Sequence, residues 1–343
     1  MKVGLMVYGD LEQLSGGYLY DRMLVRELRR RGHHVNVFPL HRDPCTERDE
    51  HADRKVRSWM NEQDIVVQDE LCHPSLLGLN ASRERSVVAL VHNLSACLAS
   101  SNETVHAMER SFLKGVDAVI CTSHATLAAC RSLHPLLPPA TVAYPGRDHV
   151  LPRPRLPGGS DLRILHVGNI HPVKGLDVLL AALSELMPFP FRLDVVGSIV
   201  DEDFFRSLGG LMRGPMRDRV RFLGPVPMAD MWERYCQADV MATPSRYEGF
   251  GIALLEAMGF GVPVIAGQEG GARELVANGR EGFLVPPGDH AAVARYLQAL
   301  SDDDLREEMG RAARRRWEAH PTWERSLAGA VDMIEGVQAA CRG

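Results

Sequence analysis

Short apolar runs rich in Val, Ile and Leu alternate along the chain with longer segments in which apolar residues recur at helical spacing. Apolar runs of this length indicate strands buried on both faces, and their alternation with helices predicts parallel sheets covered by helices on both sides. In the first half the predicted strands are residues 2–8, 34–40, 64–68, 86–92 and 117–123, with helices near 18–31 and 103–114. Residues 41–60 match no element that the pattern identifies.

The second half starts the same alternation again, after a segment rich in proline and glycine that can form neither a helix nor a central strand. Its predicted strands are 162–168, 191–197, 219–224, 239–244 and 262–267, with helices from Leu176 and from Gly251 and a helical pattern after about 289. We therefore expect two doubly wound α/β domains. Their predicted ranges are 1–150 for the N-terminal domain, 151–161 for a linker, 162–325 for the C-terminal domain, and 326–343 for a helix that packs back toward the N-terminal domain.

Composition narrows the class of protein. With 343 residues and 45% hydrophobic content the chain can bury two cores, and a net charge of −5 gives no general attraction to nucleic acid. The seven cysteines are scattered without a C-x-x-C pair, which argues against a disulfide framework or a zinc cluster. The apolar start is too short for a signal peptide, and the apolar stretch 250–267 contains Glu256, so a cytoplasmic protein is expected.

The densest chemical signal is SRYEGFGIALLEAMG, which follows the predicted strand 239–244. Gly249 and Gly251 allow a close approach of the backbone to a ligand, and the first amides of the following helix suit a phosphate. Carboxylates at Glu248 and Glu256 could accept hydrogen bonds from sugar hydroxyls on either side of that phosphate. The alternative is a buried helix in which one glutamate is a cap and the other is solvated.

The two glutamates, which have seven residues between them, and the EGFG that opens the stretch resemble the signature of family 4 glycosyltransferases, which are retaining enzymes of the GT-B fold. Residues 168–182, 220–245 and 270–289 each resemble a stretch of this family, in the same order. The resemblance implies two Rossmann-like domains facing a central cleft. It further implies that Glu248 contacts the donor sugar, that Glu256 holds the ribose hydroxyls, and that the amides of Phe250, Gly251 and Ile252 bind sugar and diphosphate.

The departing diphosphate gains negative charge as the glycosidic bond breaks, so a cation must stand beside it. Enzymes of the family typically use a lysine and an arginine rather than a metal. Lys174 matches the lysine, whereas Asn169 stands where the arginine is expected. Arg273 or Arg246 could supply the missing charge. The acidic string 302–304 is interpreted as the start of a helix rather than a metal site, so neither metal nor cofactor is expected.

In the N-terminal half, Ser15, Gly16 and Gly17 resemble the glycine-rich loop that the family places near diphosphate and acceptor. His92 ends a predicted strand where the family often has a histidine near the reacting sugar. A lone histidine there is otherwise a satisfied core residue. No G-x-G-x-x-G follows the first strand, which disfavours a nicotinamide dehydrogenase.

The resemblance implies a retaining glycosyltransferase that moves a sugar from a nucleoside diphosphate sugar to a saccharide, lipid-linked or small-molecule acceptor, the leaving phosphate taking the acceptor's proton. Alternatives are an epimerase or phosphorylase on the same fold, or a nucleotide-sugar-binding subunit without turnover, which Asn169 suggests. One predicted helix face carries Arg22, Arg26, Arg29 and Arg30. It is either solvated or a weak peripheral contact with anionic lipid at the inner face of the membrane.

Overall fold

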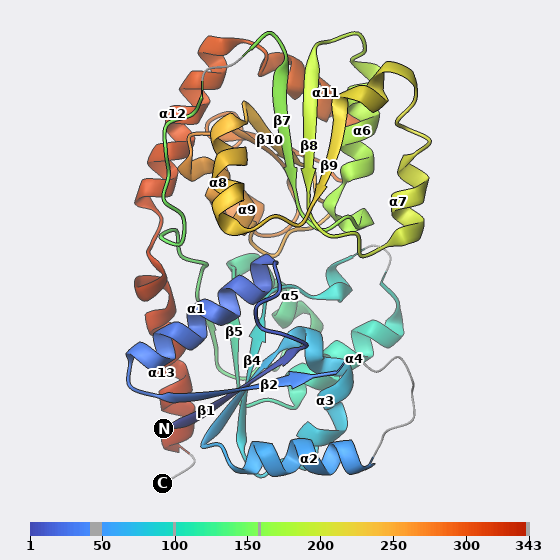
Figure 1. The fold of residues 1–343 in the computed structure, drawn as a ribbon. Helices are drawn as coiled ribbons and strands as arrows, with labels where there is room; N and C mark the ends of the chain where they lie inside the picture. The colour runs from blue at the N-terminus through green and yellow to red at the C-terminus, as the bar shows by residue number, and fades with distance from the viewer. Residues whose placement is uncertain (42–49, 99–100, 157–158, 341–343) are drawn as a thin grey trace. The chain divides into compact units, whose positions relative to one another are not determined.

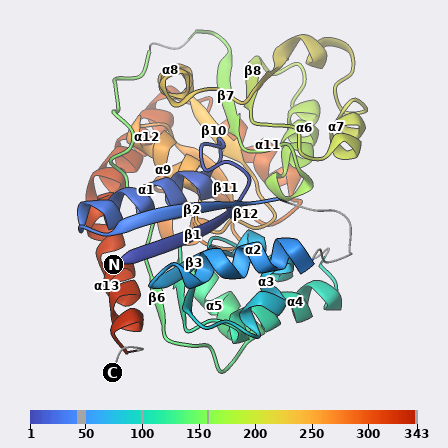
Figure 2. The ribbon, with the colours of Figure 1, turned by 60° about the horizontal axis from the view of Figure 1, so that its bottom comes forward.

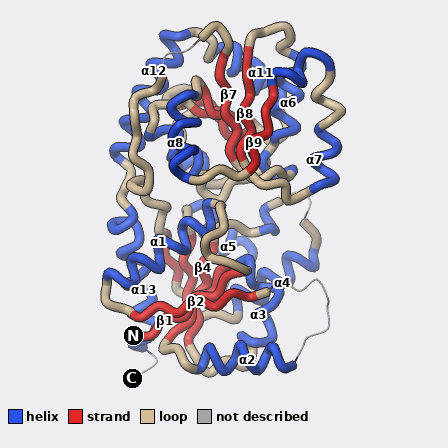
Figure 3. Tube along the Cα trace, in the orientation of Figure 1, coloured by secondary structure: helices blue, strands red, loops and turns tan. Residues whose placement is uncertain are grey.

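The computed structural model describes residues 1–41, 50–98, 101–156 and 159–340, which form two compact units, each built on its own sheet (Figures 1 and 3). The first unit comprises residues 1–13, 17–146 and 322–343, and the second comprises 14–16 and 147–321. The sheet of each unit is entirely parallel, with the doubly wound α/β arrangement expected from the alternating pattern.

The sheet of the first unit has the strand order β2-β1-β3-β4-β5-β6. Its strands are β1 (Lys2–Tyr8), β2 (His34–Leu40), β3 (Ile65–Asp69), β4 (Ser86–Val91), β5 (Ala118–Cys121) and β6 (Ala140–Val142). Every residue of β3, β4 and β5 is buried. Because the strands are parallel, their carboxyl ends lie at one edge of the sheet, and the loops that leave this edge can converge on a ligand.

Helices cover both faces of this sheet, and Figure 2 shows α3, α4 and α5 grouped together on one of them. The helices are α1 (Gly16–Arg30), α2 (Glu50–Asn61), α3 (His73–Asn80), α4 (Glu103–Lys114), α5 (His124–Leu133) and α13 (Trp323–Ala340). The last helix packs against β4, β5 and β6. The ring of Trp323 lies edge-on to that of Tyr20 of α1, with 5.4 Å between centroids, and Tyr20 in turn lies edge-on to His92 at 5.2 Å. The helix α2 lies in the stretch for which the pattern identified no element, and residues 42–49 before it lie outside the described part.

The second unit repeats this architecture with the strand order β12-β11-β10-β7-β8-β9. Its strands are β7 (Leu162–Val167), β8 (Phe191–Val196), β9 (Val220–Gly224), β10 (Val240–Thr243), β11 (Val264–Gly267) and β12 (Gly282–Val285). Its helices are α6 (Leu176–Glu185), α7 (Glu202–Leu208), α8 (Met228–Gln237), α9 (Ile252–Gly259), α10 (Ala272–Leu275), α11 (His290–Ala299) and α12 (Asp303–Ala319). The core beneath α6 and α11 is apolar throughout, and α9 packs beside α12.

Residues of the two charged segments that raised alternatives make local contacts. Asp302 caps α12 by accepting a hydrogen bond from the Leu305 amide at 2.9 Å, with acidic residues in the first turn, as the helix-start interpretation predicts. On the arginine face of α1, Arg22 donates to the carbonyls of Leu11 and Gln13, and Arg30 pairs with Glu27 at 2.7 Å. Within the described residues no helix combines the length and the apolarity needed to cross a bilayer.

Candidate active site

The predicted donor-binding residues of the second unit lie in loops that leave the carboxyl edge of its sheet. The loop after β7 contains η3 (Pro172–Lys174), the loop after β10 contains Glu248, and the loop after β11 contains residues 268–271. All three strands are neighbours or next neighbours in the sheet. This edge is where open parallel sheets bind their ligands.

A glycine brings the loop after β7 against the loop after β10. Gly175 has φ +68°, and a Cβ atom there would lie 2.1 Å from the carbonyl oxygen of Pro244, so only glycine fits. Next to this contact the Arg246 amide donates to the Val173 carbonyl at 2.8 Å, while its guanidinium pairs with Asp177 at 2.6 Å. Arg246 therefore holds the two loops together, and its charge is already balanced by Asp177.

A second contact between these two loops is the ion pair of Lys174 with Glu248. The Lys174 ammonium donates to both carboxylate oxygens, at 3.0 and 2.8 Å, and the Ser245 hydroxyl donates to one of them at 3.2 Å. The Lys174 side chain is 29% exposed and that of Glu248 17%. Two residues singled out separately from the sequence therefore meet at one point, where both remain open to a ligand.

The backbone of Glu248 is fixed by the loop after β11. Its amide donates to the Glu269 carbonyl at 3.1 Å, and its carbonyl accepts from the Gly271 amide at 2.7 Å. Gly270 has φ +90°, and a Cβ atom there would come within 2.1 Å of the Glu248 carbonyl oxygen. The carboxylate of Glu248 is thus held at a defined place by two glycines that let the loops touch.

Helix α9 begins directly after this loop, with Gly251 at its N-cap position. The first amides of a helix have no partner within the helix, and they carry the positive end of its dipole. Phe250 is buried, and its ring lies 5.6 Å from that of His320, so this side chain belongs to the core. The start of α9 therefore offers backbone donors at Gly251 and Ile252 beside the Lys174–Glu248 pair.

The second glutamate of the motif, Glu256, is buried on α9. One carboxylate oxygen accepts a hydrogen bond from the Tyr235 hydroxyl at 2.6 Å, and the other lies 2.8 Å from His149 Nε2. Burial raises the pKa of Tyr235 well above its usual value, which keeps the hydroxyl protonated as a donor. The side chain of Glu256 is 9% exposed. Its two partners were not predicted, and its contact with ribose stays a prediction.

Asn169, which stands where the arginine was expected, and Arg273, which could replace that arginine, make few contacts within the protein. Asn169 follows β7, and its side chain makes no hydrogen bond among the described residues. Arg273 is 54% exposed and reaches Glu269, one turn away, at 3.2 Å. A surface pair of this kind is weak, so the Arg273 guanidinium is free to turn toward another anion.

A buried histidine close enough to the ion pair to interact with both of its charges was not predicted from the sequence. His166 is fully buried in β7, with Nδ1 at 2.9 Å from the Ala242 carbonyl and no partner for Nε2 among the described residues. Burial, together with the positive charge of Lys174, lowers the pKa of His166 to about 4. His166 is therefore neutral at neutral pH. A histidine directly after the apolar residues Ile164 and Leu165 of this strand was the available signal.

In the first unit, His92 follows β4 at the carboxyl edge, as predicted. A Cβ atom at Gly17 would lie 3.5 Å from the imidazole, so the glycine-rich loop and His92 are neighbours. The Nε2 atom of His92 lies 3.2 Å from Asp21 Oδ1 and 3.7 Å from Asp69 Oδ2. Of these residues the sequence analysis identified His92 and Gly17 but neither aspartate.

Asp21, Asp69 and Glu70 form a buried acidic group behind His92. Burial raises the pKa of both aspartates to about 7, and the charge of Asp21 contributes to the shift at Asp69. Glu70 accepts hydrogen bonds from the amides of His92 and Asn93, at 2.9 and 3.3 Å. The ligand-type atoms of Asp21, Asp69 and His92 all lie within 4.8 Å of one another, a spacing that would also accept a metal ion. Acidic residues at the carboxyl end of a buried strand were the signal for Asp69 and Glu70.

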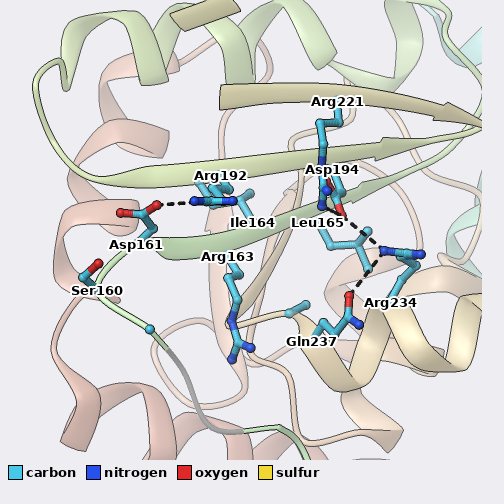
Figure 4. A pocket seen from close by; sticks show the side chains of 12 residues that line it. Ser160, Asp161, Arg163, Ile164, Leu165, Arg192, Asp194, Arg221, Arg234 and Gln237 are labelled. Carbon is cyan, nitrogen blue, oxygen red and sulfur yellow. Dashed lines mark hydrogen bonds and ion pairs between the residues drawn. The ribbon is translucent and has the colours of Figure 1, made fainter. Parts of the chain in front are cut away.

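A hollow of about 330 Å³ lies at the opposite edge of the second sheet, at the amino ends of β7, β8 and β9 (Figure 4). Its arginines are paired with aspartates: Arg192 with Asp161 at 3.0 Å, and Arg221 with Asp194 at 2.7 Å. Because parallel α/β sheets bind their ligands at the carboxyl ends of the strands, this hollow is not the predicted donor site.

Sequence comparison finds a family that the second unit resembles. Residues 152–316 match the family model described as glycosyl transferases group 1. The D-inositol 3-phosphate glycosyltransferase of Streptomyces avermitilis is 36% identical over 188 residues, which are 52% of this chain and 40% of that protein. The enzyme of the same name from Xylanimonas cellulosilytica is 36% identical over 202 residues, 57% of this chain and 47% of the relative. The similarity thus spans less than half the length of these relatives.

Solved structures resemble nearly the whole chain. Sucrose-phosphate synthase of Thermosynechococcus elongatus matches with a TM-score of 0.86 at 24% identity, over 99% of both chains. Anabaena HepE in complex with UDP-glucose matches with a TM-score of 0.80 at 18% identity, over 98% of this chain and 100% of that one. The chain therefore has the GT-B fold, and its residues 152–316 are similar to the glycosyl transferases group 1 family.

Proposed function

We propose that this protein is a retaining glycosyltransferase that moves a sugar from a nucleoside diphosphate sugar to an acceptor hydroxyl. The observation that carries the proposal is the Lys174–Glu248 pair beside the first amides of α9. Together they offer a cation, a carboxylate and backbone donors, which are the groups that a sugar diphosphate needs. The family match and the relatives named as glycosyltransferases support this assignment.

The donor diphosphate is proposed to lie at the start of α9. The amides of Gly251 and Ile252 and the helix dipole attract its negative charge. As the glycosidic bond breaks, charge accumulates on the leaving diphosphate, and the Lys174 ammonium turns from Glu248 to this charge. The Glu248 carboxylate then accepts a hydrogen bond from a hydroxyl of the donor sugar. The acceptor attacks from the side that the diphosphate leaves, and the leaving phosphate takes its proton.

The second positive charge on the diphosphate is proposed to come from Arg273. Arg246 is a weaker candidate, because Asp177 and the carbonyl of Pro172 already bind its guanidinium. Arg273 makes only a surface contact with Glu269, so it can turn to the diphosphate as a bidentate clamp. We expect Arg273→Ala to lower kcat about a hundredfold. The change Asn169→Arg is expected to restore part of that loss.

Glu256 is proposed to bind the ribose hydroxyls of the donor. Tyr235 and His149 each occupy one position on a carboxylate oxygen, and each oxygen keeps a further lone pair. The two partners hold the carboxylate in a fixed orientation before the donor arrives. Because UDP-glucose is the ligand of Anabaena HepE, UDP-sugars are the first donors to test, with phosphorylated polyols and sugars as acceptors.

The test is a donor screen with two readouts. Thermal stabilisation by UDP-, GDP-, ADP- and dTDP-sugars reports binding, and release of the nucleoside diphosphate with and without acceptors reports turnover. The expected result is acceptor-dependent release with retention at the anomeric carbon, seen by NMR of the product, and loss of turnover in Glu248→Gln. Binding without release for every acceptor would favour a binding subunit. Product without an acceptor would indicate an epimerase, and phosphate as the acceptor a phosphorylase.

A further inference from the structure

Hydrogen bonds of its main chain hold His92 in place, independently of any contact of its ring. Its amide donates to Glu70 Oε2 at 2.9 Å, and its carbonyl accepts from the Thr122 hydroxyl at 3.2 Å. The imidazole lies edge-on to the Tyr20 ring at 5.2 Å between centroids, with Gly17 beside it. The ring therefore has little room to swing, and its two nitrogens face defined directions.

The two nitrogens of His92 have different surroundings. Nε2 faces the buried carboxylates of Asp21 and Asp69, at 3.2 and 3.7 Å. Within the described part of the chain Nδ1 has no hydrogen-bond partner, and it is not among the buried unpaired atoms. A carboxylate beside a ring nitrogen accepts its proton in a hydrogen bond, and the proton on Nε2 leaves a lone pair on Nδ1 of the neutral ring.

The acidic group offers oxygens that can accept this hydrogen bond at neutral pH. Burial raises the pKa values of Asp21 and Asp69 to about 7, and a carboxyl oxygen without a proton accepts a hydrogen bond whether or not the other oxygen is protonated. Arg22 lowers the pKa of Asp21, but its guanidinium donates to backbone carbonyls. The titratable groups around the cluster are Tyr18, Tyr20, Asp21 and Arg22 of α1, Asp69, Glu70 and Cys72 after or at the end of β3, His92 after β4, and Cys121 of β5.

We propose that Asp21 is the positioning residue of His92. With Asp69 it holds the proton on Nε2, fixes that tautomer, and so presents Nδ1 as the acceptor for a substrate hydroxyl at the carboxyl edge of the first sheet. This inference rests on the proposed transfer of a sugar to a hydroxyl. It assigns a function to a charged residue on a helix that otherwise covers the sheet.

The experiment replaces the charge of Asp21 while keeping its shape. Asp21→Asn is expected to lower kcat/KM about tenfold to a hundredfold, as loss of an orienting carboxylate commonly does. The KM values for donor and acceptor show which substrate supplies the hydroxyl. Glu27→Gln is the matched control, because Glu27 is a buried carboxylate on the same helix that pairs with Arg30 instead of His92.

A second readout does not depend on turnover. ¹⁵N NMR of the imidazoles distinguishes the two tautomers, and a His92→Gln sample identifies the resonance of His92. The wild type and Glu27→Gln are expected to show the proton on Nε2, and Asp21→Asn a mixture of both tautomers. If Asp21→Asn does not fold, Asp69→Asn is measured in the same way. A wild type without turnover would contradict the proposed function, while the tautomer result would still decide the role of Asp21.

Two results would overturn the positioning role. One is an Asp21→Asn protein with the tautomer and the kinetics of the wild type. The other is one equivalent of Zn²⁺ or Mn²⁺ bound by the wild type and lost in Asp21→Asn, measured by elemental analysis after dialysis. That result would make the group a cation site rather than a hydrogen-bonded support for the imidazole.

Discussion

Replacing Lys174 by methionine should separate the role of the lysine in stability from its role in catalysis. Methionine keeps an apolar stem of similar length and removes the charge. In the resting protein Lys174 and Glu248 are partly exposed, and pairs of this kind contribute about 0–1 kcal/mol to stability. During transfer the ammonium faces charge that develops on the leaving group, where one such donor is worth about 2.7–4 kcal/mol. We therefore expect kcat to fall about 10²–10³-fold while the free energy of unfolding changes by less than about 1 kcal/mol.

The assay measures both quantities on the same preparation. Release of the nucleoside diphosphate at saturating donor and acceptor gives kcat, and denaturant unfolding gives the change in stability. Arg246→Met is the matched control, because Arg246 is also paired and partly exposed but is bound to Asp177. Replacing Arg246 should loosen the loop that contains Lys174 without removing the Lys174 ammonium.

Three outcomes would contradict this reasoning. A Lys174→Met enzyme with kcat within a fewfold of the wild type would mean that another group stabilises the leaving diphosphate. A loss of several kcal/mol in stability would mean that the ion pair is structural. If Lys174→Met raised the donor KM without changing kcat, the lysine would bind the ground state as strongly as the transition state.

Three further predictions concern the groups around this pair. Tyr235→Phe removes the hydroxyl that donates to buried Glu256, and we expect it to lower the free energy of unfolding by about 1.5–3 kcal/mol and to raise the donor KM more than it lowers kcat; unchanged donor KM and stability would refute the coupling. His166 has a pKa of about 4 when folded and about 6.5 when unfolded, so the unfolded state takes up the proton first and stability falls as the pH falls from about 6.5 to 4. At pH 5 this loss is about 2 kcal/mol. Because the raised pKa values of buried Asp21 and Asp69 add stability over the same pH range, the loss is measured as the stability of the wild type minus that of His166→Gln, which should fall by about 2 kcal/mol between pH 7 and pH 5 in denaturant unfolding. Turnover should persist in excess EDTA, because protein cations and helix amides are proposed to stabilise the leaving group; activity lost on chelation and restored by Mn²⁺ or Mg²⁺ would contradict this mechanism.

The sequence predicts the sheets well because parallel strands buried on both faces leave an unbroken apolar run. The predicted strand at residues 2–8 coincides with β1, and the run from Leu162 differs from β7 by one residue. The helix α2 is missed because its segment, EHADRKVRSWMN, is mostly polar. The strand β12, with four residues that begin at Gly282, is too short to stand out. Local pattern therefore identifies central elements and misses those at the margins of the sheets.

Motifs in the sequence identify single residues of the site but not the contacts between them. Lys174 and Glu248 could be named from motifs, but their contact depends on the approach of Gly175 to Pro244, which lies 69 positions further along the chain. Asp21 escaped notice because a charged residue on an amphipathic helix is normally solvated. Its role comes from the packing of α1 against the loop after β4, and no spacing within the sequence encodes that packing.

The first unit contains residues from both ends of the described chain, and this has a consequence for biosynthesis. Its sheet is complete at Val142, but α13, which covers β4, β5 and β6, is synthesised nearly two hundred residues later. Until then the face of the sheet beside Tyr20 lacks Trp323 and the helix that buries it. The second unit, which lies between these segments, can finish folding first on the ribosome. The folding of the first unit is therefore completed last, although its synthesis begins first.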